Sequence, residues 1–286
     1  MNRPSMDAEC VVDCRNELGE GALWCPIEQR LWWIDIQKPT LWSWRPGGAA
    51  EQWPLPKPPG SFALRKRGGF LFAFRGGLAT LNEPGGEPKW LPGLEPGDER
   101  FNDGKCDRAG RFWAGTMDRK LASAIGRLYR VAPDFRLEPM DRGFTISNGI
   151  GWSPDDRIMY FTDTPSRRIY RYEFDAAAGT IARRRLFVEV EPGHGGPDGL
   201  TVDAEGCVWS AQFDRGCVNR YDPDGKLERS VRLPVQRPTT CMFGGPELDT
   251  LYVTSAAMGL AGQDKAGGLF ALHPGVRGLP EARFAG

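Results

Sequence analysis

Apolar and polar residues alternate over short runs of about four to six positions along most of this 286-residue chain. This period of two is typical of half-buried β-strands, and we find no convincing amphipathic helix. Turn-forming stretches such as Pro154–Asp156 and Asp222–Gly225 separate the runs. Glycine permits a positive φ and proline presets φ, so these stretches indicate tight turns. The pattern therefore predicts an all-β fold.

The predicted strands form a unit that recurs six times along the chain. Each unit has a short first strand, a second strand centred on an aromatic residue, and a third strand. The first strands are expected to begin at Gly21, Ser61, Gly104, Gly149, Gly199 and Thr240. The central aromatic residues of the second strands are Trp33, Phe72, Trp113, Tyr160, Trp209 and Tyr252. They recur about every 40 to 50 residues, a spacing typical of propeller blades and too long for leucine-rich or tetratricopeptide repeats.

One such unit cannot bury both faces of its small sheet, whereas six units arranged around an axis can. We therefore predict a six-bladed β-propeller that forms a single domain over residues 1–286, with a metal site in its central channel. Residues 1–9 and 280–286 should supply strands that close the ring, or tails that fray. The main alternative is an array of two or more β-sandwich domains, but no linker or change of composition divides the chain.

Composition narrows the function classes. Lys plus Arg and Asp plus Glu total 37 each, without a basic stripe, so we expect no nucleic-acid partner. No segment approaches the roughly 18 apolar residues of a membrane span, and the first residues lack the apolar core of a signal peptide. The 7 cysteines favour reduced, buried thiols in a cytoplasmic protein. A Cys10–Cys14 bridge in an oxidising compartment is the alternative.

Polar residues stand directly before the glycine near the start of several first strands. They are Glu20, Asn148, Asp198 and the pair Asn102–Asp103. The first strand of each propeller blade lines the central channel, so these side chains should converge at one mouth. A single Asp or Asn before Gly is ordinary turn chemistry, but Glu is a poor turn residue and the set lies in register. Converging carboxylates repel one another, which indicates a divalent cation held by oxygen ligands, such as Ca²⁺, Mg²⁺ or Mn²⁺.

At these residues the chain resembles the regucalcin, gluconolactonase and luciferin-regenerating-enzyme family. The matching segments are GEGALW (19–24), RFNDGKCDRAGRFWAGTM (100–117), SNGIGWSPDDRIMYFTDT (147–164), PDGLTVDAEGCVW (197–209) and TTCMFGG (239–245). The resemblance implies a six-bladed propeller with one divalent metal in its channel, and many members hydrolyse sugar lactones. We favour Ca²⁺ and leave Zn²⁺, Mn²⁺, Mg²⁺ and Fe²⁺ open.

The resemblance also implies roles for individual residues. Glu20, Asn148 and Asp198 resemble the metal ligands, and Asp198 also resembles the catalytic acid/base. Arg100 and Asn102 resemble the pair that contacts the substrate. Asp103 is left open as a further contributor to the site.

The chain departs from the family pattern after the Gly-Thr-Met motif at 115–117. Many members carry a glutamate shortly after this motif, whereas here Asp118, Arg119 and Lys120 follow. Either this loop has drifted and Lys120 lies in solvent, or Lys120, together with Arg119, faces a substrate carboxylate. The second interpretation implies an acidic lactone, derived from an aldaric or uronic acid, in place of a neutral aldonolactone.

The sequence therefore predicts metal-dependent hydrolysis of a small-molecule sugar lactone to the open-chain sugar acid. Two alternatives remain from the residues alone. One is a non-catalytic propeller that acts as a metal-binding regulator or a scaffold, because a fold by itself does not decide function. The other is a promiscuous esterase or phosphotriesterase. His194, in the loop before Asp198, either roofs the channel or is a plain loop residue, and we favour the loop.

Overall fold

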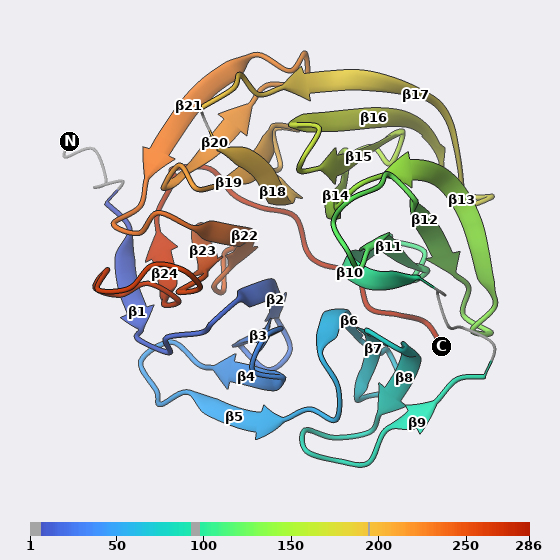
Figure 1. The fold of residues 1–286 in the computed structure, drawn as a ribbon, viewed down its shortest axis with the longest axis horizontal. Coiled ribbons are helices and arrows are strands. Elements are labelled where there is room, and N and C mark those ends of the chain that lie inside the picture. The colour runs from blue at the N-terminus through green and yellow to red at the C-terminus, as the bar shows by residue number, and fades with distance from the viewer. Residues whose placement is uncertain (1–6, 93–97, 194) are drawn as a thin grey trace.

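The protein is a six-bladed β-propeller, as predicted (Figure 1). The computed structural model describes residues 7–92, 98–193 and 195–286. Six sheets, each of four antiparallel strands, stand around a central axis, with the first strand of each blade nearest that axis (Figure 1). No helix in the described ranges is long and apolar enough to cross a membrane.

The blades follow one another in chain order around the ring. Blade 1 has β2 (Gly19–Cys25), β3 (Arg30–Asp35), β4 (Thr40–Trp44) and β5 (Glu51–Pro54), and blade 2 has β6 (Pro59–Leu64), β7 (Phe70–Phe74), β8 (Gly77–Leu81) and β9 (Lys89–Trp90). Blade 3 has β10 (Glu99–Cys106), β11 (Phe112–Asp118), β12 (Gly126–Val131) and β13 (Leu137–Phe144), and blade 4 has β14 (Ser147–Trp152), β15 (Ile158–Asp163), β16 (Arg168–Asp175) and β17 (Thr180–Glu189). Blade 5 has β18 (Gly196–Val202), β19 (Val208–Phe213), β20 (Cys217–Tyr221) and β21 (Leu227–Arg232). Blade 6 has β22 (Pro238–Gly244), β23 (Thr250–Ser255), β24 (Leu269–Leu272) and β1 (Glu9–Val12).

The two ends of the chain contribute differently to the ring. Strand β1 is the outer strand of blade 6, where it pairs antiparallel with β24 and so closes the ring. Of the N-terminal residues predicted to close the ring, Glu9 lies in this strand. Residues 280–286 form no strand of their own, but Phe284 bridges to Arg65 and is fully buried against blades 2 and 3.

Aromatic side chains fill the spaces between blades. The six central aromatic residues predicted from the repeat are all at most 3 % exposed. In blades 3 and 5 the indole N–H groups of Trp113 and Trp209 donate to Asp107 and Asp203, each at 2.8 Å. Each of these aspartates also accepts a backbone N–H of its own hairpin, so a buried polar group fixes the hairpin and the tryptophan together.

All 7 cysteines are free thiols, as predicted, and the alternative Cys10–Cys14 bridge is not formed. Five of them are buried, while Cys10 and Cys14 are half-buried. Burial raises the pKa of the Cys241 thiol to about 12, so this group stays protonated and inert at neutral pH.

Every inner strand carries a β-bulge at the same point of the repeat, and in β2, β10, β14 and β18 this point holds a polar residue followed by glycine. The register shifts after Glu20 in β2, Phe101 in β10, Asn148 in β14 and Pro197 in β18, and at the equivalent points of β6 and β22. A bulge adds one unpaired residue and turns side chains away from the regular alternation. The repeated bulge therefore redirects the polar residues at the end of each inner strand.

The glycine after the polar residue allows neighbouring inner strands to approach closely. A Cβ on Gly149 would lie 2.6 Å from the carbonyl oxygen of Asp198, and one on Gly199 would lie 2.6 Å from the hydroxyl of Thr240. Both distances are far below van der Waals contact. Glycine at these two positions is thus required by the close approach of the inner strands.

We predict that Gly149→Ala destabilises the protein by about 1–3 kcal/mol, because the added methyl group forces β14 away from β18. Chemical denaturation measures this difference. Gly76→Ala is the matched control, since its added Cβ would meet only the flexible end of Lys57. Equal stability of the two variants would contradict the argument.

Candidate metal centre and active site

Glu20, Asn148 and Asp198 lie buried on three inner strands, β2, β14 and β18, at the same end of the channel. We call this end the upper mouth. Asp198 is only 4 % exposed. Its pKa is raised well above the ordinary value, first by burial and then by the negative charges of Glu20 and Asp103. The structure therefore brings carboxylates from three blades into one electrostatic cluster.

The pKa values of the other two acids of this cluster, Glu20 and Asp103, are also raised. Burial, together with repulsion from Asp103, raises the pKa of Glu20 to about 8. Burial also raises the pKa of Asp103 to about 6, against an opposing attraction from Lys105. Asp103, which the sequence left open, is thus a third acid of the cluster.

The hydrogen bonds that Glu20 and Asp198 accept leave carboxylate oxygen available to bind a cation. Glu20 accepts a short hydrogen bond from the hydroxyl of Thr240 and a longer one, of 3.2 Å, from the backbone N–H of Gly21. Asp198 Oδ1 is buried without a hydrogen-bond partner among the described residues. A buried carboxylate oxygen without a partner requires an explanation, and an ion is one of the ordinary explanations. The all-oxygen donor set fits a hard divalent cation such as Ca²⁺.

A chain of hydrogen bonds crosses three blades beside the acids. Arg100 Nη1 donates to Asn102 Oδ1 at 3.0 Å, and Asn102 Nδ2 donates to Asn148 Oδ1 at 3.0 Å. Asn148 Nδ2 donates to the hydroxyl of Thr164 at 2.8 Å, which in turn donates to the carbonyl of Pro197 at 2.7 Å. The chain thus ends at the residue before Asp198. It connects the predicted substrate-binding pair to two of the predicted metal ligands and fixes their relative positions.

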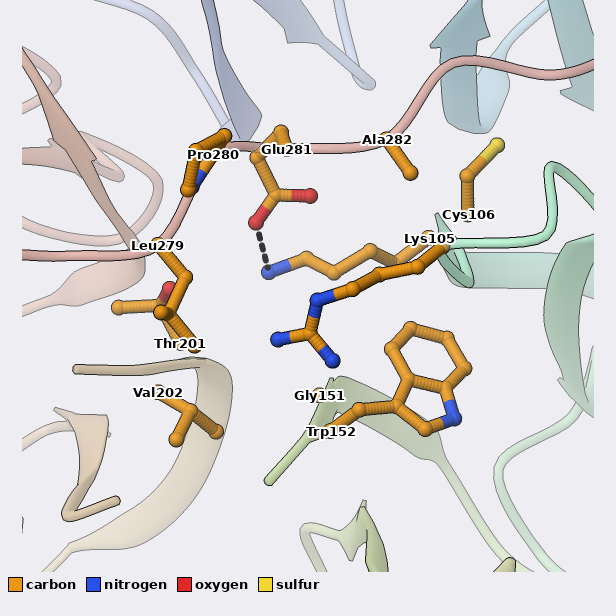
Figure 2. A pocket seen from close by; sticks show the side chains of 11 residues that line it. Lys105, Cys106, Gly151, Trp152, Thr201, Val202, Leu279, Pro280, Glu281 and Ala282 are labelled. Atoms are coloured by element: carbon orange, nitrogen blue, oxygen red, sulfur yellow. Dashed lines mark ion pairs between the residues drawn. The ribbon is translucent and has the colours of Figure 1, made fainter. Parts of the chain in front are cut away.

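The opposite end of the channel, the lower mouth, is covered by the C-terminal segment. Residues 279–282 line a pocket there together with residues of β10, β14 and β18, and Figure 2 shows Glu281 facing Lys105 across it. Lys105 Nζ donates to the carbonyl of Leu200 at 3.1 Å and forms an ion pair with Glu281 at 3.3 Å (Figure 2). The pocket there measures about 30 Å³, enough for one or two water molecules. We therefore expect a substrate to reach the acids from the upper mouth.

The loop after β11 gives Arg119 and Lys120 different surroundings. Arg119 Nε donates to the carbonyl of Glu99 at 2.9 Å, which ties its side chain to the backbone of blade 3. The Lys120 side chain is exposed, and its backbone N–H donates to Asp118 at 2.9 Å. Its ammonium forms no ion pair with a described carboxylate. The substrate-facing role of Lys120 stays a prediction, and its exposure agrees with the solvent interpretation.

A second acidic group lies near the lower hairpin of blade 5. Asp203, Glu205 and Cys207 place one ligand atom each within 4.8 Å of one another. Arg220 already occupies this group, because its guanidinium pairs with Asp203 at 2.8 Å and also with Glu205. The positive charge that the acids require is thus supplied by the protein. We assign this group to the packing of blade 5.

The sequence interpretation missed three residues at the upper mouth, namely Thr164, Thr240 and Arg75. Thr164, which follows β15, holds Asn148 within blade 4, and Thr240 of blade 6 holds Glu20 of blade 1. Neither contact is indicated by a local sequence pattern. Thr240 occupies the bulge of β22, and its place in the repeat was the one available signal. His194 lies outside the described residues.

The raised pKa values predict how the stability of the metal-free protein depends on pH. The pKa of Glu20 rises from 4.5 to about 8 on folding, so its contribution to stability is complete below about pH 4.5 and is lost as the pH rises through 8. We expect the chelator-treated protein to melt at a lower temperature at about pH 8 than at about pH 5, and added Ca²⁺ to reduce that difference. Thermal unfolding with EDTA or CaCl₂ measures it. Glu20→Gln should flatten the dependence, and an unchanged slope in that variant would contradict the assignment.

Comparison with known proteins agrees with this fold. The model of the SMP-30/gluconolactonase/LRE-like region matches residues 18–257. The chain is 40 % identical to 6-deoxy-6-sulfogluconolactonase of Pseudomonas putida, covering 97 % of this chain and 98 % of that protein. It is 38 % identical to pentonolactonase XacC of Haloferax volcanii, covering 96 % of each. The crystal structure of the calcium-binding protein regucalcin from Agrobacterium tumefaciens matches with a TM-score of 0.91 and 29 % identity, over 98 % of this chain and 97 % of that one. The protein belongs to the SMP-30/gluconolactonase/LRE-like family.

Proposed function

We propose that this protein hydrolyses a sugar lactone to the open-chain sugar acid and requires a divalent cation for the reaction. The observation that carries this proposal is the acidic cluster of Glu20, Asp103 and Asp198, in which Asp198 Oδ1 is buried and has no described hydrogen-bond partner. A scaffold propeller has no use for a buried aspartate whose pKa is raised by two neighbouring acids in the channel. Such strongly perturbed groups in a concave site favour catalysis.

Glu20, Asn148 and Asp198 are the residues that would hold the cation. Two carboxylates and one amide oxygen are ligands typical of Ca²⁺, and the calcium-binding regucalcin of similar fold supports Ca²⁺ as the first choice. A divalent cation bound there polarises a carbonyl oxygen and lowers the pKa of a bound water.

Asp198 is the residue that would move the proton. As the oxygen of the attacking water bonds to the lactone carbonyl carbon, the Asp198 carboxylate takes one proton from that water. The ring C–O bond then breaks, and Asp198 returns the proton to the departing alkoxide oxygen. The product carboxylic acid ionises in solution, so each turnover releases one proton and leaves Asp198 as it began.

Arg100 and Asn102 have different roles in positioning the groups of the site. Asn102 is buried, and its amide bridges Arg100 and Asn148, so it fixes the positions of these two side chains. One guanidinium nitrogen of Arg100, Nη1, donates to Asn102 Oδ1 and to the carbonyl of Phe101. Its remaining N–H groups can donate in pairs to a substrate oxygen, a geometry that Lys does not offer.

The relatives support the substrate class. The sulfogluconolactonase and the pentonolactonase are both named for sugar lactones, although for different ones. A sugar lactone is thus the chemistry they share, and we assign this class to the protein.

We predict that Asp198→Asn lowers kcat/KM for the best lactone by at least about 10²–10⁴-fold, because the variant loses the group that exchanges the proton and weakens cation binding. Proton release from a panel of lactones, followed by pH-stat titration with EDTA or CaCl₂, measures the effect. Asp224→Asn, an exposed aspartate in a turn of the same blade, is the matched control.

Two outcomes would contradict the proposal. One is full lactone hydrolysis by Asp198→Asn. The other is cation binding by the wild-type protein without turnover of any lactone, which would favour the non-catalytic regulator.

A further inference from the structure

A hollow of about 70 Å³ opens at the upper mouth beside the acidic cluster. It is lined by Ile36, Gln37, Pro58, Pro59, Arg75 and Arg100. These residues come from the upper ends of blades 1, 2 and 3, which the ring places side by side (Figure 1). About 10–15 Å³ of such volume accommodates one water molecule, so the hollow has room for a group of several atoms.

Two guanidinium groups line this hollow without an acidic partner. Neither Arg75 nor Arg100 forms an ion pair with any carboxylate in the described part of the chain. The other cations of this rim are engaged: Arg119 donates to the carbonyls of Glu99 and Arg75, and Lys57 lies 4.4 Å from the ring centre of Trp90. Among the described residues, Arg75 and Arg100 are the two cations that line the hollow. Arg100 donates through Nη1 to the carbonyl of Phe101 and to Asn102 Oδ1, which leaves its other guanidinium nitrogens for a ligand.

The two charges lie close enough to act on each other. Burial and the positive charge of Arg75 lower the pKa of Arg100 to about 10, against a smaller opposing attraction from Glu20. A like-charge pair beside a partly buried hollow is unfavourable unless an anion lies between the two groups. Because the charges of both Arg75 and Glu20 affect the pKa of Arg100, this residue connects the hollow with the acidic cluster.

We propose that this hollow binds an anionic substituent of the substrate, a carboxylate or a sulfonate, and that the protein therefore acts on acidic sugar lactones. The inference rests on the proposed lactone hydrolysis and names its substrate class. Guanidinium groups bind carboxylate and sulfonate oxygens with paired, charge-assisted hydrogen bonds. A lactone ring that reaches the acids with its carbonyl end can place such a substituent against Arg75 and Arg100.

This assignment differs from one of the two interpretations that the sequence left open, in which Lys120 faces a substrate carboxylate. The structure leaves Lys120 exposed in the loop after β11 and outside the residues that line the hollow. Arg75 follows β7 in blade 2, at the end where Pro59 begins β6. It takes the role proposed for Lys120 from a different blade.

The test compares kcat/KM for three lactones with the Ca²⁺-loaded protein. The substrates are neutral gluconolactone, 6-deoxy-6-sulfogluconolactone and a glucarolactone. Binding of a sulfonate and binding of a carboxylate are thus tested separately. We expect the wild-type protein to prefer at least one anionic lactone. Arg75→Gln should lower the ratio of anionic to neutral kcat/KM on the order of ten- to hundredfold, the value of a hydrogen bond between charged groups. Lys57→Gln is the matched control and should keep the wild-type ratio.

The outcomes separate this inference from the proposed function. Hydrolysis of gluconolactone without preference for either anionic lactone would overturn the anion site and leave lactone hydrolysis standing. An unchanged ratio in Arg75→Gln, together with a lowered ratio in Lys120→Gln, would overturn it in favour of the loop lysine. Failure of the wild-type protein to hydrolyse any of the three would overturn both proposals.

Discussion

The structure depends on one electrostatic constraint, which is that several carboxylates are buried together on the axis of the ring. Glu20, Asp103 and Asp198 come from three blades, and each raises or is raised by another through burial and repulsion. In the metal-free protein their protons relieve the repulsion. A divalent cation would relieve it at neutral pH, and the proposed chemistry follows from that exchange of protons for a cation.

The fold makes this arrangement possible by narrowing the channel and fixing its walls. A bulge in every inner strand turns the polar side chains out of the regular alternation, and glycine after the polar residue lets the strands approach. The hydrogen-bond chain from Arg100 to Pro197 locks blades 3, 4 and 5 together. The C-terminal segment covers the lower mouth, where Glu281 neutralises Lys105. One end of the channel is thus covered, and the acids open toward the other end.

Much of this architecture could be predicted from the sequence, because the propeller repeats its chemistry. The six aromatic centres and the polar residue before glycine recur along the chain, so fold and acidic cluster follow from spacing alone. The outer strands were harder to predict. In β17, for example, residues 182–186 are all exposed, so no apolar alternation marks the strand. Residues 280–286 were predicted to form a ring-closing strand or a fraying tail. Both predictions were wrong, because this segment forms no strand and Phe284 packs into the hydrophobic core.

The residues proposed to bind the anionic substituent could be predicted only in part. Arg100 was predicted from the family resemblance, whereas Arg75 belongs to the neighbouring blade 2, and the packing of blades 2 and 3 places the two at one hollow. Thr240 reaches Glu20 across the junction between the last blade and the first. A repeat predicts what is equivalent between blades, whereas selectivity arises from contacts between blades that are not equivalent.

The most direct measurement of the central claim is anomalous diffraction from crystals grown with Mn²⁺ as a probe for the divalent cation. The account predicts one strong peak at the upper mouth, within coordination distance of the oxygens of Glu20, Asn148 and Asp198. A peak found only beside Asp203 and Glu205, or no peak at the upper mouth, would contradict it.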